Sequence, residues 1–418
     1  MKVLMIGWEL PPLFAGGLGQ VCDALLHSFS KTEHEVTYIM PYGPADFHTK
    51  YGNRVLIAQH KIPAHKLKNI HLKTVGTGFH AYMDERQYDE VHKRIAREKQ
   101  FASDGKVVKN LYGDNLFEEM ERFAQRVRLI AEDEDFDVIH IHEFHTYPAG
   151  HQAREVSGKP LVMHVHNTIF DRALGRASEE ERSREYYALA HSDHIVAISD
   201  YVKNMVVNNY GIDPNKITVV HNEPTLYEEP EVKVDIMPDE KVVLFLGRIS
   251  VQKGPEYFVE AAKRVLDHHE KVKFVVVGSG DKLNSMIEHA ASLGIGQNFL
   301  FTGWLNKQES ARMFDRADAF VMPSVSEPFG LVPYESLQHR TPPIISKTSG
   351  ISEVLQNCIK VDFWDTEKLA DRIISLLSYP SMHQTMTENG YHEVMNRSWD
   401  TAVTKLVRLY KDVIRKAS

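Results

Sequence analysis

Two carboxylates, Glu327 and Glu335, lie eight positions apart on either side of the tripeptide Phe329-Gly330-Leu331. An apolar run precedes them and predicts a buried strand, and the tripeptide is expected to open a helix. Glu327 would then lie at the strand exit and Glu335 about two turns into the helix. The unpaired N–H groups of a helix start would favour an anion such as a phosphate at Gly330 and Leu331.

Carboxylates beside a phosphate would repel it, so we expect Glu327 and Glu335 to bind hydroxyl groups. A sugar and a ribose separated by a diphosphate fit this pattern. The alternative is an ordinary helix start with acidic residues near its N-terminus, and the rest of the chain has to decide between the two.

The loop Gly247–Gly254 is a second candidate site, because it contains Arg248 and Lys253 between a predicted strand and a predicted helix. Arginine can bind two phosphate oxygens with its planar guanidinium group, and lysine acts as a mobile point charge. Together they could neutralise a diphosphate leaving group. The alternative is a solvated basic loop. The position at a strand exit, in the same half as the Phe-Gly-Leu turn, favours an anion site.

A glycine-rich turn, Gly16-Gly17-Leu18-Gly19, follows the first predicted strand and opens a helix. Glycine lets the backbone approach a phosphate closely, and the helix dipole favours the negative charge. The turn matches neither the P-loop pattern nor the dinucleotide fingerprint. Taken alone, it is a weak indication of a phosphate site.

The segment 140–145, His-Ile-His-Glu-Phe-His, could suggest a metal site with Glu143 as a ligand. His140 and His142 would share one face of a strand, but the turn that follows would scatter the other side chains. A hydrogen-bonding cluster at the strand end is therefore favoured over a metal centre. Glu143 and His145 still fall at the edge of the sheet where ligands bind, as does His166 at the end of another predicted strand.

Short apolar runs alternate with helical patterns along the whole chain, which predicts an α/β protein with helices on both faces of its sheets. The series is interrupted by the Pro- and Glu-rich stretch Pro224–Asp239, which is typical of a linker. The final run, Trp399–Ile414, is strongly helical. The strands are expected at residues 2–8, 35–40, 55–58, 137–142, 161–164, 194–198 and 216–221, and then at 241–246, 273–277, 298–301, 319–322 and 343–345.

Length and composition limit the class of protein. A chain of 418 residues is too long for one ordinary core and predicts two domains. The net charge of −8 argues against nucleic acid or an anionic membrane as the main partner. The two cysteines, Cys22 and Cys358, suit a reducing compartment, and no signal peptide or transmembrane segment is expected. These features predict a cytoplasmic protein. The polar stretch Thr77–Asn115 is expected to be an insertion.

Together these elements resemble the retaining nucleotide-sugar glycosyltransferases of the two-Rossmann-domain type called GT-B. The branch they resemble is the glycogen and starch synthase-like group. The match covers nearly the whole chain, and its most specific parts are the Gly-Arg…Lys-Gly loop and the Glu-x7-Glu segment. Phe14 departs from the pattern, because bacterial starch and glycogen synthases carry a lysine there. The resemblance implies an N-terminal acceptor domain at 1–225, a C-terminal donor domain at 226–398 and a C-terminal helix, 399–418, that crosses back to the first domain.

The resemblance implies how the diphosphate of the donor would be bound. Arg248 and Lys253 would hold it, helped by the turn at residues 329–331. Gly16 and Gly17 would close on it from the other domain. Domain closure would then be part of each turnover.

The resemblance also implies sites for the rest of the donor. Glu335 would bind the ribose hydroxyls and Glu327 hydroxyls of the transferred sugar. His166 matches the active-site histidine that contacts this sugar, and Trp304 stands where the family places the nucleotide base. Glu143 takes the place of an aspartate in glycogen synthases.

The implied reaction is transfer of a hexosyl unit, glucose by this resemblance, from a nucleotide diphosphate sugar to an acceptor such as an α-glucan. Family members are thought to use front-side attack, with the leaving diphosphate taking the acceptor's proton. No metal ion and no cofactor beyond the nucleotide sugar are required. Alternatives are transfer to a lipid or small-molecule acceptor and a non-catalytic module that binds nucleotide sugars. A hydrolase or a phosphorylase-like enzyme is less consistent with the residues.

Overall fold

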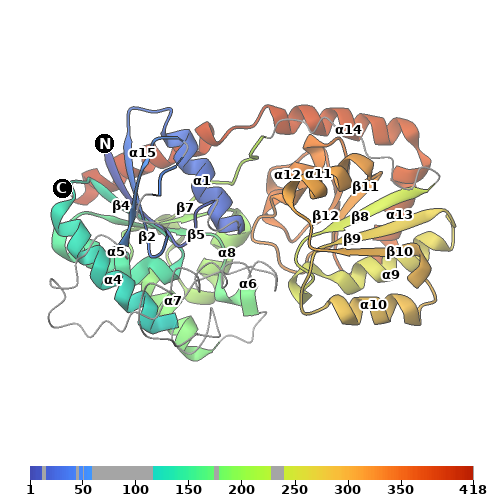
Figure 1. The fold of residues 1–418 in the computed structure, drawn as a ribbon, viewed down its shortest axis with the longest axis horizontal. Helices are drawn as coiled ribbons and strands as arrows, with labels where there is room; N and C mark the ends of the chain where they lie inside the picture. Colours follow the sequence, from blue (N-terminus) through green and yellow to red (C-terminus); the bar gives the residue numbers. More distant parts are fainter. Residues whose placement is uncertain are drawn as a thin grey trace, which may run out of the picture.

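The computed structural model describes residues 1–11, 16–43, 47–49, 51–58, 116–173, 178–226 and 240–417. Two parallel sheets, each with helices on both faces, lie side by side along the long axis of the molecule (Figure 1). This arrangement confirms the α/β prediction with two Rossmann-like units. Phe14, the predicted insertion at 77–115 and most of the predicted linker lie outside the described residues.

In the part of the chain that the structure describes, the first sheet has seven strands in the order β3-β2-β1-β4-β5-β6-β7, and they pair in parallel. Continuous apolar runs form these strands because both faces of the sheet are covered. In β1, for example, four of the five residues are buried. The strands are β1 (Lys2–Ile6), β2 (Glu35–Met40), β3 (Arg54–Ile57), β4 (Val138–His142), β5 (Leu161–Val165), β6 (His194–Ala197) and β7 (Ile217–Val219).

Alternate residues of each strand supply two separate cores, one on each face of the first sheet. Val3 and Met5 of β1 pack with the helices α1 and α15, whereas Leu4 and Ile6 pack with α4, α5 and α8. Among the described residues of this half, the α-helices are α1 (Gly17–Phe29), α4 (Leu116–Asp133), α5 (Tyr147–Ser157), α6 (Ile169–Ala173), α7 (Glu179–His191) and α8 (Asp200–Tyr210).

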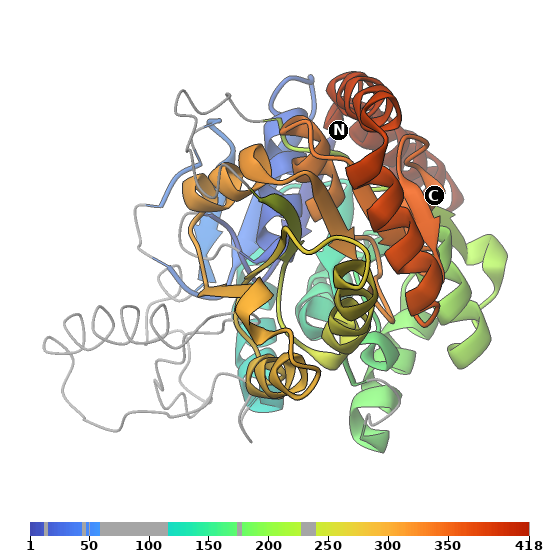
Figure 2. The same cartoon turned by 90° about the vertical axis from the view of Figure 1, so that its right-hand side faces the viewer.

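The second sheet has six parallel strands in the order β10-β9-β8-β11-β12-β13. Helices α9, α10 and α13 cover one face and α11, α12 and α14 the other, and Figure 2 views this half end on. The strands are β8 (Lys241–Leu246), β9 (Val272–Val277), β10 (Phe299–Gly303), β11 (Ala319–Met322), β12 (Pro343–Ser346) and β13 (Ile359–Val361), and the helices are α9 (Pro255–Leu266), α10 (Leu283–Ser292), α11 (Lys307–Arg316), α12 (Val332–Gln338), α13 (Thr366–Ser378) and α14 (Pro380–Met395).

The C-terminal helix α15 (Trp399–Ala417) lies on the first half of the molecule, although α14 lies on the second (Figure 1). It packs beside α1, and its apolar face, which includes Val403, Leu406 and Tyr410, is part of the first domain's core. The chain therefore crosses between the two sheets a second time before it reaches α15.

The two halves contact each other close to the Glu-x7-Glu segment. Ser199 donates a hydrogen bond to the carbonyl oxygen of Pro328 (2.6 Å), and the hydroxyl of Ser326 donates to Asp171 (2.7 Å). On the other side, the carboxylate of Glu353 accepts hydrogen bonds from the first backbone N–H groups of α8. These contacts hold the segment that contains Glu327 against the first domain.

Two details differ from the predictions. Helix α12 begins at Val332, so Glu335 lies in its first turn and not two turns into it. Strand β13 has only three residues, two of them partly exposed, and its short pattern was too weak to predict. Within the part of the chain that the structure describes, no helix combines the length and the apolar character needed to cross a membrane.

Candidate active site

A cavity of about 620 Å³ lies between the carboxyl ends of the two sheets. Its walls come from both halves, namely from the segments that follow β5, β8, β9 and β11 and from the start of α1. Ligands of open α/β sheets bind at this edge. The structure brings together here all but one of the predicted site residues, which are Gly16, Gly17, His166, Arg248, Lys253, Trp304, Glu327, Phe329, Gly330, Leu331 and Glu335.

The floor of the cavity in the second half is made of backbone that approaches closely. Gly278 has a φ of 132°, and a Cβ atom there would overlap the carbonyl oxygen of Gly247. The N–H of Gly247 donates to Val277 (3.0 Å), and that of Ile249 donates to Ser279 (2.9 Å). Only glycine at 278 permits this packing of the loops after β8 and β9. The Gly-Ser-Gly run after a strand was the sequence signal that could have added these residues to the predicted site.

Lys253 forms an ion pair with Glu327, whose carboxylate also accepts a hydrogen bond from Ser324 (3.2 Å). The side chain of Glu327 is 8% exposed and that of Lys253 23%. From the sequence, Glu327 was assigned to the transferred sugar and Lys253 to the diphosphate, without a contact between them. Their contact means that the Lys253 charge is partly balanced before any anion binds, and that Glu327 is oriented by its partner.

Glu335 and Trp304 line the same cavity. Burial raises the pKa of Glu335, whereas the nearby Lys307 and His339 lower it. Trp304 is 50% exposed, so its flat apolar ring is available to a stacking partner. Asn222 also lines the cavity, and no pattern in the sequence distinguished it.

Glu143 is the exception among the predicted donor-binding residues, because it does not line the cavity. Its carboxylate accepts hydrogen bonds from the backbone N–H groups of His166 (2.7 Å) and Asn167 (3.0 Å), and Arg172 lies 3.3 Å away. The side chain is 3% exposed, and the backbone φ of Glu143, 69°, is unusual for a residue other than glycine. Glu143 therefore holds the segment that carries His166, and its direct contact with a donor stays a prediction.

Burial raises the pKa of Glu143 to about 7, against the opposing effect of Arg172. Between about pH 5 and pH 7, the Glu143 carboxyl should thus stay protonated in the folded protein, whereas it is ionised in the unfolded chain. We expect this group to lower the free energy of unfolding as pH rises from about 5 to 7, by at most about 1.4 kcal/mol per pH unit. Glu143→Gln should remove this part of the pH dependence in urea unfolding curves.

The matched control for this measurement is Glu121→Gln, which changes an exposed carboxyl on α4. It should leave the pH profile of stability as it is in the unmodified protein. The same slope in Glu143→Gln and the unmodified protein would contradict the assignment of the titration to Glu143.

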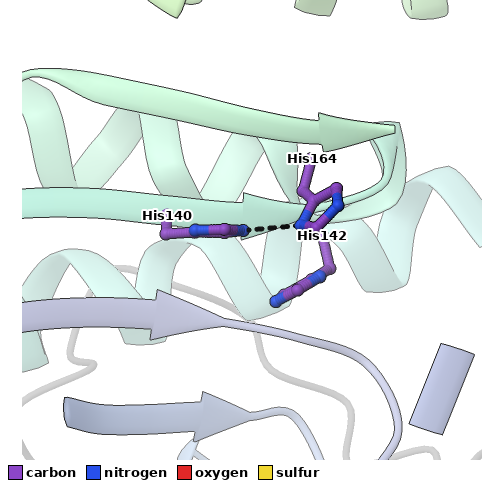
Figure 3. Close-up of side chains that lie close together, drawn as sticks. All are labelled: His140, His142 and His164. Carbon is purple, nitrogen blue, oxygen red and sulfur yellow. Dashed lines mark hydrogen bonds between the residues drawn. The ribbon is translucent and has the colours of Figure 1, made fainter. Parts of the chain in front are cut away.

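Four buried histidines lie close together at the first sheet, His140 and His142 on β4, His164 on β5 and His166 directly after the end of β5. A nitrogen of each of the first three lies within 4.8 Å of the other two (Figure 3). His142 lies nearly parallel to His140 and His164, with interplanar angles of 30° and 28°. Since lone pairs lie in the ring planes, stacked rings direct them past one another and not toward a shared ion. Hydrogen bonds instead join His140 to His164 (3.2 Å) and His142 to His166 (2.9 Å).

Two family models match this sequence. The model described as "Glycosyl transferases group 1" covers residues 228–393, and "Glycosyltransferase Family 4" covers residues 93–222. With the two parallel sheets and the cavity between them, these matches establish that the chain belongs to the GT-B glycosyltransferases.

Three relatives show how far the similarity extends along the chain. A glycosyltransferase of Methanocaldococcus jannaschii is 25% identical over 98% of each chain. A D-inositol 3-phosphate glycosyltransferase of Rhodococcus jostii is 30% identical over 66% of each chain. A glycogen synthase of Mycobacterium tuberculosis is 23% identical over 98% of this chain and 94% of its own.

Solved structures share the fold over the full length. The sucrose-phosphate synthase of Thermosynechococcus elongatus has a TM-score of 0.70, with 17% identity and complete coverage of both chains. The catalytic domain of Arabidopsis thaliana starch synthase IV, bound to ADP and acarbose, has a TM-score of 0.69, with 15% identity over 99% of each chain.

Proposed function

We propose that this chain is a retaining glycosyltransferase that transfers glucose from a nucleotide diphosphate sugar to a hydroxyl group of an α-glucan. The observation that carries the proposal is the convergence of two cations, a glycine turn and two carboxylates on one cavity of a GT-B fold. The glycogen synthase and starch synthase among the similar proteins support the choice of donor and acceptor.

In the proposed complex, Arg248 and Lys253 bind the diphosphate, and the glycine turn at 16–17 approaches it from the first domain. The backbone at Gly330 and Leu331 adds N–H donors from the start of α12. The two cations stabilise the charge that develops on the leaving group, which is the main electrostatic contribution available in this cavity.

The proposal extends to the remaining groups of the donor. Trp304 stacks on the nucleotide base, and Glu335 accepts hydrogen bonds from the ribose hydroxyls. Glu327 binds hydroxyls of the transferred sugar, and its ion pair with Lys253 links the sugar position to the diphosphate position. His166 contacts the transferred sugar from the first domain.

In the proposed reaction, the bond between the anomeric carbon and the diphosphate oxygen breaks, and its electron pair remains on that oxygen. The acceptor hydroxyl oxygen bonds to the same face of the anomeric carbon, and its proton moves to the departing diphosphate. Configuration is retained. The scheme requires no metal ion and no side-chain nucleophile, so catalysis depends on positioning and on charge stabilisation.

A second candidate acceptor is a small phosphorylated polyol. The D-inositol 3-phosphate glycosyltransferase relative supports it, because its 30% identity exceeds that of the glycogen synthase, although over a shorter span. The donor chemistry would be the same in both cases. A panel of acceptors that includes glycogen and inositol phosphates separates the two.

The test combines activity with nucleotide binding. Purified protein is incubated with UDP-glucose or ADP-glucose and each acceptor in the presence of excess chelator, and NMR reports the anomeric configuration of the product. We expect an α-linked product. The matching nucleoside diphosphate at a hundred times its Kd should stabilise the folded protein by about 2.7 kcal/mol.

Glu335→Gln should weaken nucleotide binding about 10- to 100-fold, because a hydrogen bond to a charged group contributes about 1.5–3 kcal/mol. Glu367→Gln, on the exposed start of α13, is the control and should bind normally. Binding without turnover would instead support a non-catalytic nucleotide-sugar module. An inverted product, or activity lost in chelator and restored by metal, would contradict the proposed mechanism.

A further inference from the structure

The hydrogen bond between His142 and His166 joins a fully buried side chain to the cavity wall. The Nδ1 atom of His142 lies 2.9 Å from Nε2 of His166. His166 lines the cavity, whereas His142 does not. Because Nε2 of His166 is engaged by His142, Nδ1 is the nitrogen of His166 that remains to meet a ligand.

Burial selects the direction of this hydrogen bond. Both rings are neutral, since burial lowers the pKa of His142 to about 3 and that of His166 well below its usual range. One of the two nitrogens that face each other must then carry the hydrogen. The other nitrogen of His142, Nε2, is buried and has no hydrogen-bond partner among the described residues.

The two possible tautomers differ in what they leave at this orphaned atom. If His166 donated, His142 would carry its only hydrogen on Nε2, as a buried N–H without an acceptor. If His142 donates from Nδ1, its Nε2 is an unprotonated nitrogen. Orphaned buried N–H groups are rarer than under-satisfied acceptors, so donation by His142 is favoured.

The backbone of His166 is fixed from the same strand. Glu143, the residue after His142, accepts the backbone N–H of His166 at 2.7 Å. Adjacent residues of the β4 segment therefore hold both the main chain and the ring of His166. A strand end is a rigid support for such an arrangement.

We propose that His142 is a positioning residue that fixes His166 in its Nδ1–H tautomer, so that His166 donates a hydrogen bond to a hydroxyl oxygen of the transferred sugar. This inference rests on the proposed function. It adds a chemical role for His166, as donor and not acceptor, and a reason for the buried histidine behind it. Neutral His166 then recognises an oxygen lone pair without placing a positive charge beside the two cations at the diphosphate.

The tautomer can be measured without any substrate. Nitrogen-15 NMR of the histidine-labelled full chain distinguishes protonated from unprotonated ring nitrogens, and the spectrum of His166→Gln assigns the signals of His166. We expect a protonated Nδ1 and an unprotonated Nε2. A protonated Nε2 in the unmodified protein would overturn the proposal whether or not the protein transfers sugar.

Two substitutions of His142 separate positioning from packing. In His142→Leu, His166 should lose its single tautomer, and kcat/KM should fall at least about tenfold. In His142→Asn, the side-chain amide N–H lies close to the position that Nδ1 of His142 occupied. It should restore both the single tautomer of His166 and kcat/KM. Unchanged His166 signals in His142→Leu, or equal losses in the two variants, would overturn the proposal.

His140→Asn is the matched control. His140 lies on the same strand and face and is equally buried, but it bonds Tyr410 and His164 and not His166. Its replacement should leave the His166 signals unchanged. Absence of transfer with every donor would count against the proposed function, whereas transfer with the wrong His166 tautomer would count against this inference alone.

Discussion

Alanine at Arg248 or Lys253 is expected to lower kcat for glycosyl transfer by about 10²–10³-fold. Each cation faces the cavity where charge would develop on the diphosphate, and removal of one such group typically costs about 2.7–4 kcal/mol of transition-state stabilisation. Steady-state kinetics with the preferred donor measures the loss. Lys263→Ala, which removes a partly exposed cation on α9, is the control and should retain normal kinetics.

Lys253→Ala should also lower stability, unlike Lys263→Ala, because it leaves the Glu327 carboxylate without its ion-pair partner at 8% exposure. The double variant Lys253→Ala/Glu327→Gln removes the orphaned charge. We expect it to recover stability in urea unfolding but not activity. Full activity of either single alanine variant would exclude the diphosphate role, and recovery of activity in the double variant would show that the lost turnover came from misfolding.

Leu406→Ala on α15 is expected to destabilise the protein by about 2–5 kcal/mol, although the residue does not line the cavity. Leu406 is fully buried in the core that α15 shares with α1 and β1. The substitution removes apolar contacts and leaves a cavity that the packed sheet cannot fill. The melting temperature should fall by roughly 4–20 °C.

Arg408→Ala, two residues further along the same helix, is the matched control because its side chain is exposed. Its free energy of unfolding should stay within about 0.5 kcal/mol of that of the unmodified protein. Below its melting transition, Leu406→Ala should keep a normal kcat. Equal stability of the two variants would mean that α15 does not complete the first domain's core.

The fold could be predicted largely from the sequence because buried parallel strands consist of continuous apolar runs. The runs at 241–246 and 319–322 coincide with β8 and β11. Strand β13 was missed because a run of three residues, two of them partly exposed, is too short and too mixed to show a strand pattern. Glu335 was placed too deep in its helix because the Phe-Gly-Leu turn continues to Leu331 before α12 begins.

The sequence was enough to predict which residues line the cavity, but not which of their side chains contact one another. Residues that follow strands of one parallel sheet meet at the same edge, which is why Arg248 and Glu327 were found together. Pairing between side chains depends on three-dimensional register, and the Lys253–Glu327 ion pair spans 74 positions. The register of β4 and β5 likewise pairs His142 with His164, which brings His142 within hydrogen-bond distance of His166, and Glu143 accepts the backbone N–H of His166.

The return of α15 to the first domain has a consequence for biosynthesis. β1 is made first, but the helix that covers one of its faces is made only after the entire second domain. At about 5–20 residues per second, the ribosome needs roughly 20–80 s to reach α15 from β1. During that interval Val3, Met5 and Val138 have no cover from α15, whereas the second domain can close both of its cores. The domain translated second is thus the first that can complete its cores, and the apolar face of β1 that α15 covers stays incomplete until the end of translation.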